Sequence, residues 1–232
     1  DVEHCGWSNL PEDDWIWHED FAWGIGEFVW TGFDYLGEPT PYYTDWPSHS
    51  SLFGIVDLAG LPKDRYYLYR SHWNKDVETL HILPHWTWPG REGETTPIFV
   101  YTNYPSAELF INGVSQGVRT KDLTITAEGT MEHPETATSF KRQQRYRLMW
   151  MDTKYEPGEV KVVAYDNDGN AVAESVVRTA GKPHHIELVA DRDVIKADGR
   201  DLSFITVRVV DKDGNLCPDA QHLVEYSVKG EG

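Results

Sequence analysis

The pattern that most restricts the fold begins at Val77, where short segments of alternating apolar and polar residues take over the chain. These segments are divided by turn residues and include ETLHILP, PIFVYTN, AELFING, QRYRLMWM, EVKVVAYD and AVAESVVRTA. In EVKVVAYD, Val160, Val162 and Ala164 share one face of a strand, whereas Lys161 lies on the other. Short strands at this spacing predict an antiparallel β-sandwich, interrupted by a polar, threonine-rich insertion at 121–139.

Aspartate and glycine mark two of the turns. The stretches DNDGN at 166–170 and DKDGN at 211–215 both place glycine at the fourth position. A calcium-binding EF-hand loop needs glycine at its sixth position and glutamate at its twelfth, whereas Asp-Gly between alternating apolar runs is typical of a hairpin. We therefore interpret both stretches as turns.

The stretch GKP at 181–183 marks a boundary within the strand-rich part. We assign residues 76–181 to one immunoglobulin-like sandwich domain and residues 182–232 to the start of a second one. A complete domain of this type has about seven strands. The sequence predicts only about four strands after the boundary, so we expect the second domain to be truncated.

Residues 1–75 differ, because they are dense in tryptophan and poor in valine and threonine. Proline followed by acids predicts a helix from Pro11 to Trp23. The mostly apolar IGEFVW, from Ile25 to Trp30, predicts a strand covered on both faces. We expect a short strand and turn at 52–60, and a second helix from Pro62 to Trp73.

Composition narrows the class of partner. Ten Trp and twelve Tyr suit either an aromatic core or a surface that packs against the C–H faces of sugars, and both interpretations stay open. The net charge of −17 repels phosphate, so neither nucleic acid nor an anionic membrane is an expected partner. No apolar run reaches the ~20 residues that span a bilayer.

Cys5 and Cys217 lie near opposite ends of the chain, so we expect both to be free thiols. The cysteines therefore leave the cellular compartment undetermined.

Motifs for familiar chemistries are absent from the sequence. It contains no Walker loop, GxGxxG, GxSxG, HExxH or paired CxxC, so we expect neither a cofactor nor a metal site. Paired carboxyls for sugar hydrolysis lie about 5–5.5 Å or 6.5–9.5 Å apart. Glu27 and Asp34 on one extended segment would be ~23 Å apart, and the acids at 13–14 and 19–20 are expected on solvated helix faces. The sequence therefore offers no catalytic pair.

Five longer stretches follow one another along the chain: GEFVWTGFDYLGEPTPY, FGIVDLAGLPKDRYYLYRSHW, LHILPHWTWPG, VYTNYPSAELFINGVSQG and EPGEVKVVAYDNDG. In this order they resemble the C-terminal half of glycoside hydrolase family 2 enzymes, and most of all the β-galactosidases of gut Bacteroidetes. The resemblance covers nearly the whole chain.

The resemblance implies a fold and two site residues. In that family a (β/α)8 barrel carries the active site at the C-terminal ends of its strands, and β-sandwich domains follow. Residues 25–30 would then form the eighth barrel strand and residues 62–73 the closing helix. The implied fold class is mainly β, with the last β/α unit of a barrel at 1–75 in front of the sandwiches. Trp30 matches the aromatic that packs against the sugar, and Asp34 matches an acid at the same rim.

The resemblance also implies what this chain lacks. The two catalytic glutamates of the family belong to earlier barrel strands, which nothing here matches. One strand and one helix cannot close a barrel, so residues 1–75 should expose an edge and aromatics unless they fold differently, pack on the sandwich or pair with another chain. The start DVEHCGWSN and the glycine-rich end predict an internal or C-terminal piece of a longer protein.

We therefore interpret the chain as the C-terminal part of a retaining β-galactosidase-like hydrolase. We expect the chain alone to be inactive and to contact β-galactosides only as part of the parent enzyme. The resemblance suggests a periplasmic or secreted bacterial location, and homo-oligomer formation stays open. Two rival functions also stay open. One is a carbohydrate-binding module that uses Trp86, Trp88 and Trp150 as an exposed platform, against the alternative that these rings pack between barrel remnant and sandwich. The other is a structural spacer.

Overall fold

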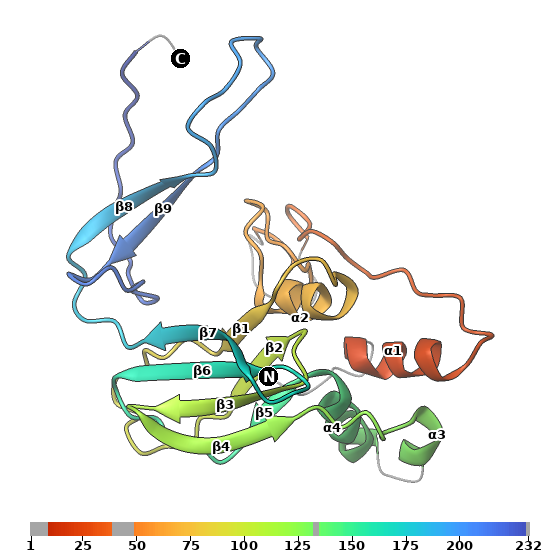
Figure 1. The fold of residues 1–232 in the computed structure, drawn as a ribbon. Helices are drawn as coiled ribbons and strands as arrows, with labels where there is room; N and C mark the ends of the chain where they lie inside the picture. The colour runs from red at the N-terminus through yellow and green to blue at the C-terminus, as the bar shows by residue number, and fades with distance from the viewer. Residues whose placement is uncertain (1–8, 39–48, 132–134, 231–232) are drawn as a thin grey trace.

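Two antiparallel sheets face each other in the computed structural model, which describes residues 9–38, 49–131 and 135–230 (Figure 1). The three-stranded sheet has the order β1-β2-β5, and the four-stranded sheet has the order β4-β3-β6-β7. The first contains β1 (Leu80–Leu83), β2 (Ile98–Thr102) and β5 (Leu148–Trp150). The second contains β3 (Ser106–Ile111), β4 (Val114–Thr120), β6 (Glu159–Tyr165) and β7 (Ala171–Arg178). The fold is thus mainly β and antiparallel, as expected, although the sequence did not indicate β4.

The core between the two sheets follows the predicted alternation. Val160, Val162 and Ala164 on β6 are each at most 1% exposed, whereas Lys161 between them points to the other face and pairs with Glu174 at 2.8 Å. Other buried core residues come from both sheets and their connections: Ile82, Trp86, Ile98, Val100, Leu109, Leu148, Trp150 and Tyr155. Full burial of such apolar side chains stabilises the fold by roughly 1.5–3 kcal/mol each.

Both aspartate–glycine stretches are turns, as predicted. Asp166 accepts hydrogen bonds from the backbone N–H groups of Asp168 at 2.9 Å and Asn170 at 2.8 Å. The same contacts recur at 211–215, where Asp211 accepts from Asp213 and Asn215, both at 2.9 Å. In each turn the fourth residue is a glycine with φ of +82°, a backbone conformation that glycine adopts at low cost.

Strand β2 is buried on both faces, and this creates a third layer. Ile98 and Val100 belong to the core between the sheets, whereas Phe99 and Tyr101 point away from it. Helices α1 (Pro11–Asp20), α2 (Asp64–Trp73), α3 (Ala127–Thr130) and α4 (Glu135–Tyr146) lie on that outer side. A second apolar cluster joins them to the sheet and contains Trp15, Ile16, Leu68, Tyr69, Phe99, Tyr101, Ile125, Ala127, Tyr146 and Met149.

The two helices predicted near the N-terminus are present, with shifted ends. Helix α1 begins at Pro11 as expected but ends at Asp20, and α2 begins at Asp64 after Lys63 at its N-cap. The polar, threonine-rich insertion, to which the sequence analysis assigned no helix or strand, contains α3 and the start of α4. Because α4 continues to Tyr146, the strand expected at 144–151 is reduced to β5.

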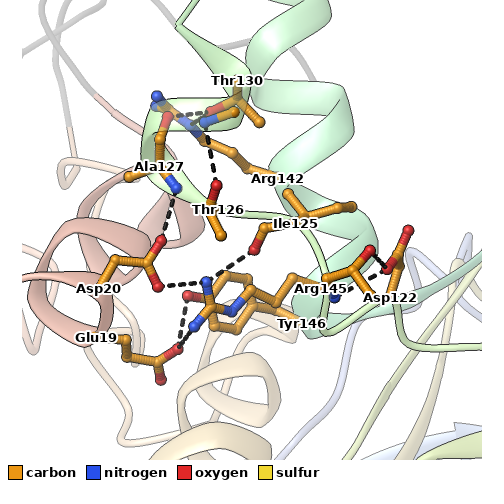
Figure 2. A network of polar contacts seen from close by, with 12 residues as sticks. Glu19, Asp20, Asp122, Ile125, Thr126, Ala127, Thr130, Arg142, Arg145 and Tyr146 are labelled. Atoms are coloured by element: carbon orange, nitrogen blue, oxygen red, sulfur yellow. Dashed lines mark hydrogen bonds and ion pairs between the residues drawn. The ribbon is translucent and has the colours of Figure 1, made fainter.

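Ion pairs hold α1 against α4 (Figure 2). Asp20 accepts from Arg145 Nη1 at 2.7 Å and from the backbone N–H of Ala127 at 2.7 Å. Glu19 accepts from Arg145 Nη2 and from the Tyr146 hydroxyl, both at 2.9 Å. The expectation of a solvated helix face is wrong for Asp20, which basic residues of a helix distant in sequence cover, whereas Glu19 stays exposed although it is paired.

The acids at the start of α1 extend the same contact. Asp13 pairs with Arg142 at 3.2 Å and accepts from the Ser139 hydroxyl at 2.6 Å. The expectation of a solvated face is therefore wrong for Asp13 as well. The α1–α4 contact is an acidic helix surface lying on a basic one.

The most deeply buried of these pairs joins Glu12 to Arg147. Glu12 is fully buried, and its Oε1 accepts from Arg147 Nε at 2.5 Å and also pairs with Nη2. The guanidinium donates to the Tyr101 hydroxyl at 3.3 Å and lies 5.9 Å from the centre of the Phe99 ring. Burial opposes the charge on Arg147, but the Glu12 carboxylate outweighs it and holds the pKa of Arg147 above its ordinary value. The pair connects α1 to the outer face of β2.

Residues 25–30 do not form the predicted strand. Ile25 and Phe28 are fully exposed, and among the described residues no strand is paired with this segment. A strand needs a neighbour to satisfy its backbone N–H and C=O groups, and none lies beside it here. The segment at 52–60 likewise forms only isolated bridges, which join Val56 to Phe33 and to Pro62. The exposed rings of Trp23, Phe28 and Trp30 agree with the expectation that this region exposes aromatics.

Beyond the GKP stretch, the described residues contain two strands rather than about four. Strands β8 (His185–Ala190) and β9 (Ile205–Val210) form a two-stranded sheet that extends away from the sandwich (Figure 1). The apolar residues after it alternate as in a strand, but only Leu216 forms a bridge, to Val210, so a third strand has no partner to complete it. The division into three domains, at 1–75, 76–181 and 182–232, stays a prediction. Within the described part of the chain, none of the helices has the length and apolarity to span a membrane.

The buried pair yields a prediction about stability. Arg147→Leu leaves the Glu12 carboxylate buried without a cation, so we expect a loss of about 3–5 kcal/mol in the free energy of unfolding. Urea unfolding followed by circular dichroism measures it. Arg178→Leu is the matched control, because its pair with Glu159 is largely exposed, and it should cost far less. The double variant Glu12→Leu/Arg147→Met should recover most of the loss, and equal losses in Arg147→Leu and Arg178→Leu would contradict the assignment.

Candidate functional site

A cavity of about 650 Å³ opens between α1, the extended segment 24–36 and α2. We call it the Trp30 pocket. Its lining includes Asp14, His18, Glu27, Trp30, Tyr35 and Tyr69. The pocket thus combines carboxyl groups with aromatic rings, which is the combination that sugar-binding cavities use.

Trp30 presents its ring to this pocket. The side chain is 74% exposed, so most of its face is free to contact a ligand. The ring packs edge-on against Tyr35 at a centroid distance of 5.9 Å, and Tyr35 packs edge-on against Phe53 at 5.4 Å. These contacts orient Trp30 although no strand supports it.

Asp34, the other predicted site residue, lies apart from the pocket lining. Its side chain is buried, and Oδ1 accepts from the backbone N–H of Gly54 and from Lys63 Nζ, both at 2.8 Å. The second oxygen pairs with Lys63 at 2.6 Å. A Cβ on Gly54 would lie 2.3 Å from the Asp34 backbone nitrogen, so only glycine permits this approach. In the structure Asp34 therefore ties the loop at 52–63 to the segment that carries Trp30.

Two carboxyl groups that the sequence did not pair meet at the Trp30 pocket. Glu27 accepts from Trp15 Nε1 at 3.1 Å, which ties the extended segment to α1. Burial, followed by repulsion from Asp14, raises the pKa of Glu27 above its ordinary value. Burial is also the main cause of the raised pKa of Asp14. Asp14 was expected on a solvated helix face, and that expectation is wrong.

A weak signal for Asp14 was present in the sequence. Asp14 and His18 are four residues apart, so a helix places both on one face, and both line the pocket. Nothing local places Glu27 opposite them, because that depends on the direction in which the chain leaves α1. The estimate of distance between Glu27 and Asp34 assumed a straight segment, which the structure does not contain.

The alternative platform of three tryptophans is not formed. Trp86 and Trp150 are at most 2% exposed and belong to the core between the sheets. Trp88 is partly buried and stacks on His85 with ring centres 4.1 Å apart. The rings pack within the sandwich, so the expected place between barrel remnant and sandwich is also wrong for Trp86 and Trp150.

Other candidate chemical groups lie elsewhere. In the described ranges, no three His, Cys, Asp or Glu residues are placed to hold one metal ion. Cys217 is a buried free thiol, whereas Cys5 lies outside the described residues.

Two domain families match the chain. Residues 93–173 match one described as "Domain of unknown function (DUF4982)". Residues 186–232 match "Glycoside hydrolase family 2 C-terminal domain 5". Both matches fall in the strand-rich part, after the residues that form the pocket.

Curated relatives extend the similarity over the pocket as well. The β-galactosidase BoGH2A of Bacteroides ovatus is 46% identical over 230 residues, which is 99% of this chain and 24% of the relative. A putative β-glucuronidase of Formosa agariphila is 32% identical over 222 residues, which is 94% of this chain and 19% of the relative. The chain thus spans no more than a quarter of the length of these two relatives.

Solved structures share the fold. A β-glycosidase from Bacteroides vulgatus has a TM-score of 0.72 and 34% identity, and the match covers 90% of this chain and 23% of that one. A glycosyl hydrolase family 2 member from Bacteroides cellulosilyticus has a TM-score of 0.64 and 31% identity, over 88% of this chain and 26% of that one. The arrangement of the elements is therefore similar to that in parts of larger glycoside hydrolases.

The raised pKa values at the pocket predict the effect of removing a charge. A carboxyl whose pKa is higher in the folded than in the unfolded state binds protons more tightly when folded, so stability falls as pH rises through its titration range. Glu27→Gln keeps an oxygen for the Trp15 hydrogen bond and removes the charge. We expect this variant to be more stable than the parent chain at pH 7, by at most about 1 kcal/mol after solvent screening, and equally stable near pH 3.

Urea unfolding at the two pH values measures this difference. Glu225→Gln is the control, because Glu225 is exposed on the C-terminal extended segment, and it should show no pH-dependent gain. A Glu27→Gln variant that is less stable than the parent chain at pH 7 would refute the assignment.

Proposed function

Because this chain belongs to glycoside hydrolase family 2, we propose that it forms one part of a retaining β-galactosidase-like enzyme that hydrolyses terminal β-galactosides. The 46% identity to a Bacteroides ovatus β-galactosidase over 99% of the chain supports the galactoside. β-Glucuronidases also occur among the relatives, at lower identity. In this proposal the chain supplies a sugar-contacting wall and the sandwich that supports it.

The observation that carries the proposal is the exposed ring of Trp30 on the wall of the pocket. Pyranose C–H groups pack on such a face, and nearby carboxyl and tyrosyl groups can accept or donate hydrogen bonds to hydroxyls. Tyr35 holds the ring edge-on. Asp34 contributes by fixing the loop at 52–63, so its proposed role is to position the sugar-binding wall.

We propose that the two carboxyls that cleave the bond come from outside this chain. A retaining glycosidase needs one ionised nucleophile and one protonated acid, so the environments must push the two pKa values apart. Asp14 and Glu27 both have raised pKa values, which does not provide that division. Glu27 is also engaged with Trp15.

The extended segment 24–36 supports the idea that residues 1–75 complete a barrel. Ile25 and Phe28 are fully exposed although apolar. Neighbouring barrel strands would cover these side chains and satisfy the unpaired backbone groups. We propose that residues 25–30 become the eighth barrel strand in the parent enzyme.

Sugar binding by the chain tests the role of Trp30. In an NMR titration with methyl β-galactoside, Trp30→Ala should weaken the affinity by roughly tenfold, because stacking on the ring is lost. Trp23→Ala is the matched control, since Trp23 is similarly exposed at 71% but does not line the pocket. Equal effects of the two variants, or none, would refute the sugar platform.

Turnover tests the location of the catalytic carboxyls. We expect the purified chain to release no nitrophenol from 4-nitrophenyl β-galactoside above the buffer rate. Hydrolysis that is abolished by Glu27→Gln or Asp34→Asn would place the chemistry within this chain and overturn that part of the proposal. The binding experiment would still judge Trp30 independently.

A further inference from the structure

A second cavity lies on the side of α2 where the helix ends, separate from the Trp30 pocket. Its volume is about 300 Å³, and it is bounded by the end of α2, the turn between β2 and β3, the end of β4 and the α1–α4 contact. Four basic side chains line it: His72, Lys75, Lys121 and Arg145. We call it the lysine pocket, after Lys75 and Lys121.

The basic residues of this pocket divide into two kinds. His72 and Arg145 both pair with Glu19, at 3.0 Å and 2.9 Å. Neither Lys75 nor Lys121 takes part in an ion pair within the described residues, although both line the same cavity. Glu19 is thus already engaged, and the two lysines leave an excess of positive charge in a chain whose net charge is −17.

Lys121 is held in place by the backbone around it. Its own N–H donates to the Pro105 carbonyl at 2.9 Å, and its Nζ donates to the carbonyl of Thr102 at the end of β2. Asn103 also lines the pocket and is held in place, because its amide accepts from the Thr79 N–H at 2.9 Å and donates to the Val77 carbonyl at 3.0 Å. An ammonium group has three donors, so the known contact of Lys121 leaves two for a ligand.

The surroundings of Lys121 disfavour the charge on its amine. Burial, followed by repulsion from Lys75, lowers the pKa of Lys121 to about 8. A negatively charged ligand between them would offset the repulsion and the loss of hydration together. The local field therefore favours an anion at a place where the chain as a whole repels anions.

We propose that the lysine pocket binds a small tetrahedral oxyanion, phosphate or sulfate, between Lys75 and Lys121. Such an ion carries acceptors on all sides, which suits two separate ammonium groups better than the planar fork of a single arginine. The cavity is large enough for the ion with some of its water. The ion could be free or attached to a sugar as a sulfate ester, and this site is independent of the sugar platform at Trp30.

Calorimetric titration of the full chain at pH 7 and constant ionic strength tests the site. We expect saturable binding of one inorganic phosphate or sulfate ion per chain. Lys121→Met and Lys75→Met should each weaken the affinity about tenfold, because a charge-assisted contact is lost. Lys212→Met is the control, because Lys212 is exposed on the turn after β9, and it should leave the affinity unchanged.

The pH dependence adds a readout that a merely structural lysine would not move. Between pH 7 and 9 the affinity for sulfate, which stays a dianion throughout this range, should fall, and binding of sulfate at pH 8 should take up protons, measured in buffers of different ionisation enthalpy. Proton uptake should vanish in Lys121→Met. The other titratable or charged groups that line the pocket with Lys121 are Lys75, His72, Glu19, Arg145, Tyr104 and Tyr146. Lys121→Met keeps all of them, and Lys75→Met removes only Lys75.

The outcomes decide the proposal in each case. No saturable binding, or equal affinities in the parent chain and in both lysine variants, would overturn it. Lys75→Met keeps the test independent of folding, because Lys75 is exposed. A second titration compares galactose 6-sulfate with inorganic sulfate, and unsulfated galactose is its control. Tighter binding of the sulfated sugar than of inorganic sulfate assigns the site to a sulfate ester, and the reverse order assigns it to the free ion.

Discussion

The buried contact between Glu12 and Arg147 is the interaction on which the position of helix α1 depends. Two charges removed from water are stable only if they meet, so the pair specifies where α1 lies against β2 and the start of β5. Asp13, Glu19 and Asp20 extend the contact along α4. Because α1 forms one wall of the Trp30 pocket, its geometry follows from charge pairing on the opposite side of the same helix.

The three-stranded sheet β1-β2-β5 joins the helical layer to the sandwich. Strand β2 has no solvent face, since Val100 packs between the sheets and Phe99 packs against the helices. The helical layer and the sandwich therefore share one sheet, and each helps to stabilise the other. The extended segment 24–36 lies beyond this shared core, which is why Trp30 keeps an exposed ring while Trp86 and Trp150 do not.

Charge is distributed unevenly over the same framework. The acidic residues of α1 neutralise three arginines, Arg142, Arg145 and Arg147, whereas Lys75 and Lys121 meet no carboxylate in the described ion pairs. One side of α1 thus faces the Trp30 pocket, whose carboxyls Asp14 and Glu27 have raised pKa values. The other side of α1 borders the lysine pocket, which has an excess of positive charge. Both properties result from the desolvation that the helical layer imposes, which acts in opposite senses on acids and amines.

Local pattern was sufficient for most strands of the sandwich, the two aspartate–glycine turns and the helices near the N-terminus, because period and turn chemistry act over a few residues. It missed β4 and made β5 too long. The family resemblance, rather than local pattern, singled out Trp30 as a sugar-contacting ring, which stays a prediction. Helix α4 escaped prediction because its docking relies on arginines that meet acids more than 120 residues away. The expected strand at 25–30 failed for a related reason, since a strand exists only beside a partner. Long-range packing determines which charged groups lose their water. It decided that Asp14 and Glu27 line one pocket and that Asp34 is buried. It also left Lys75 and Lys121 without a carboxylate partner among the described ion pairs.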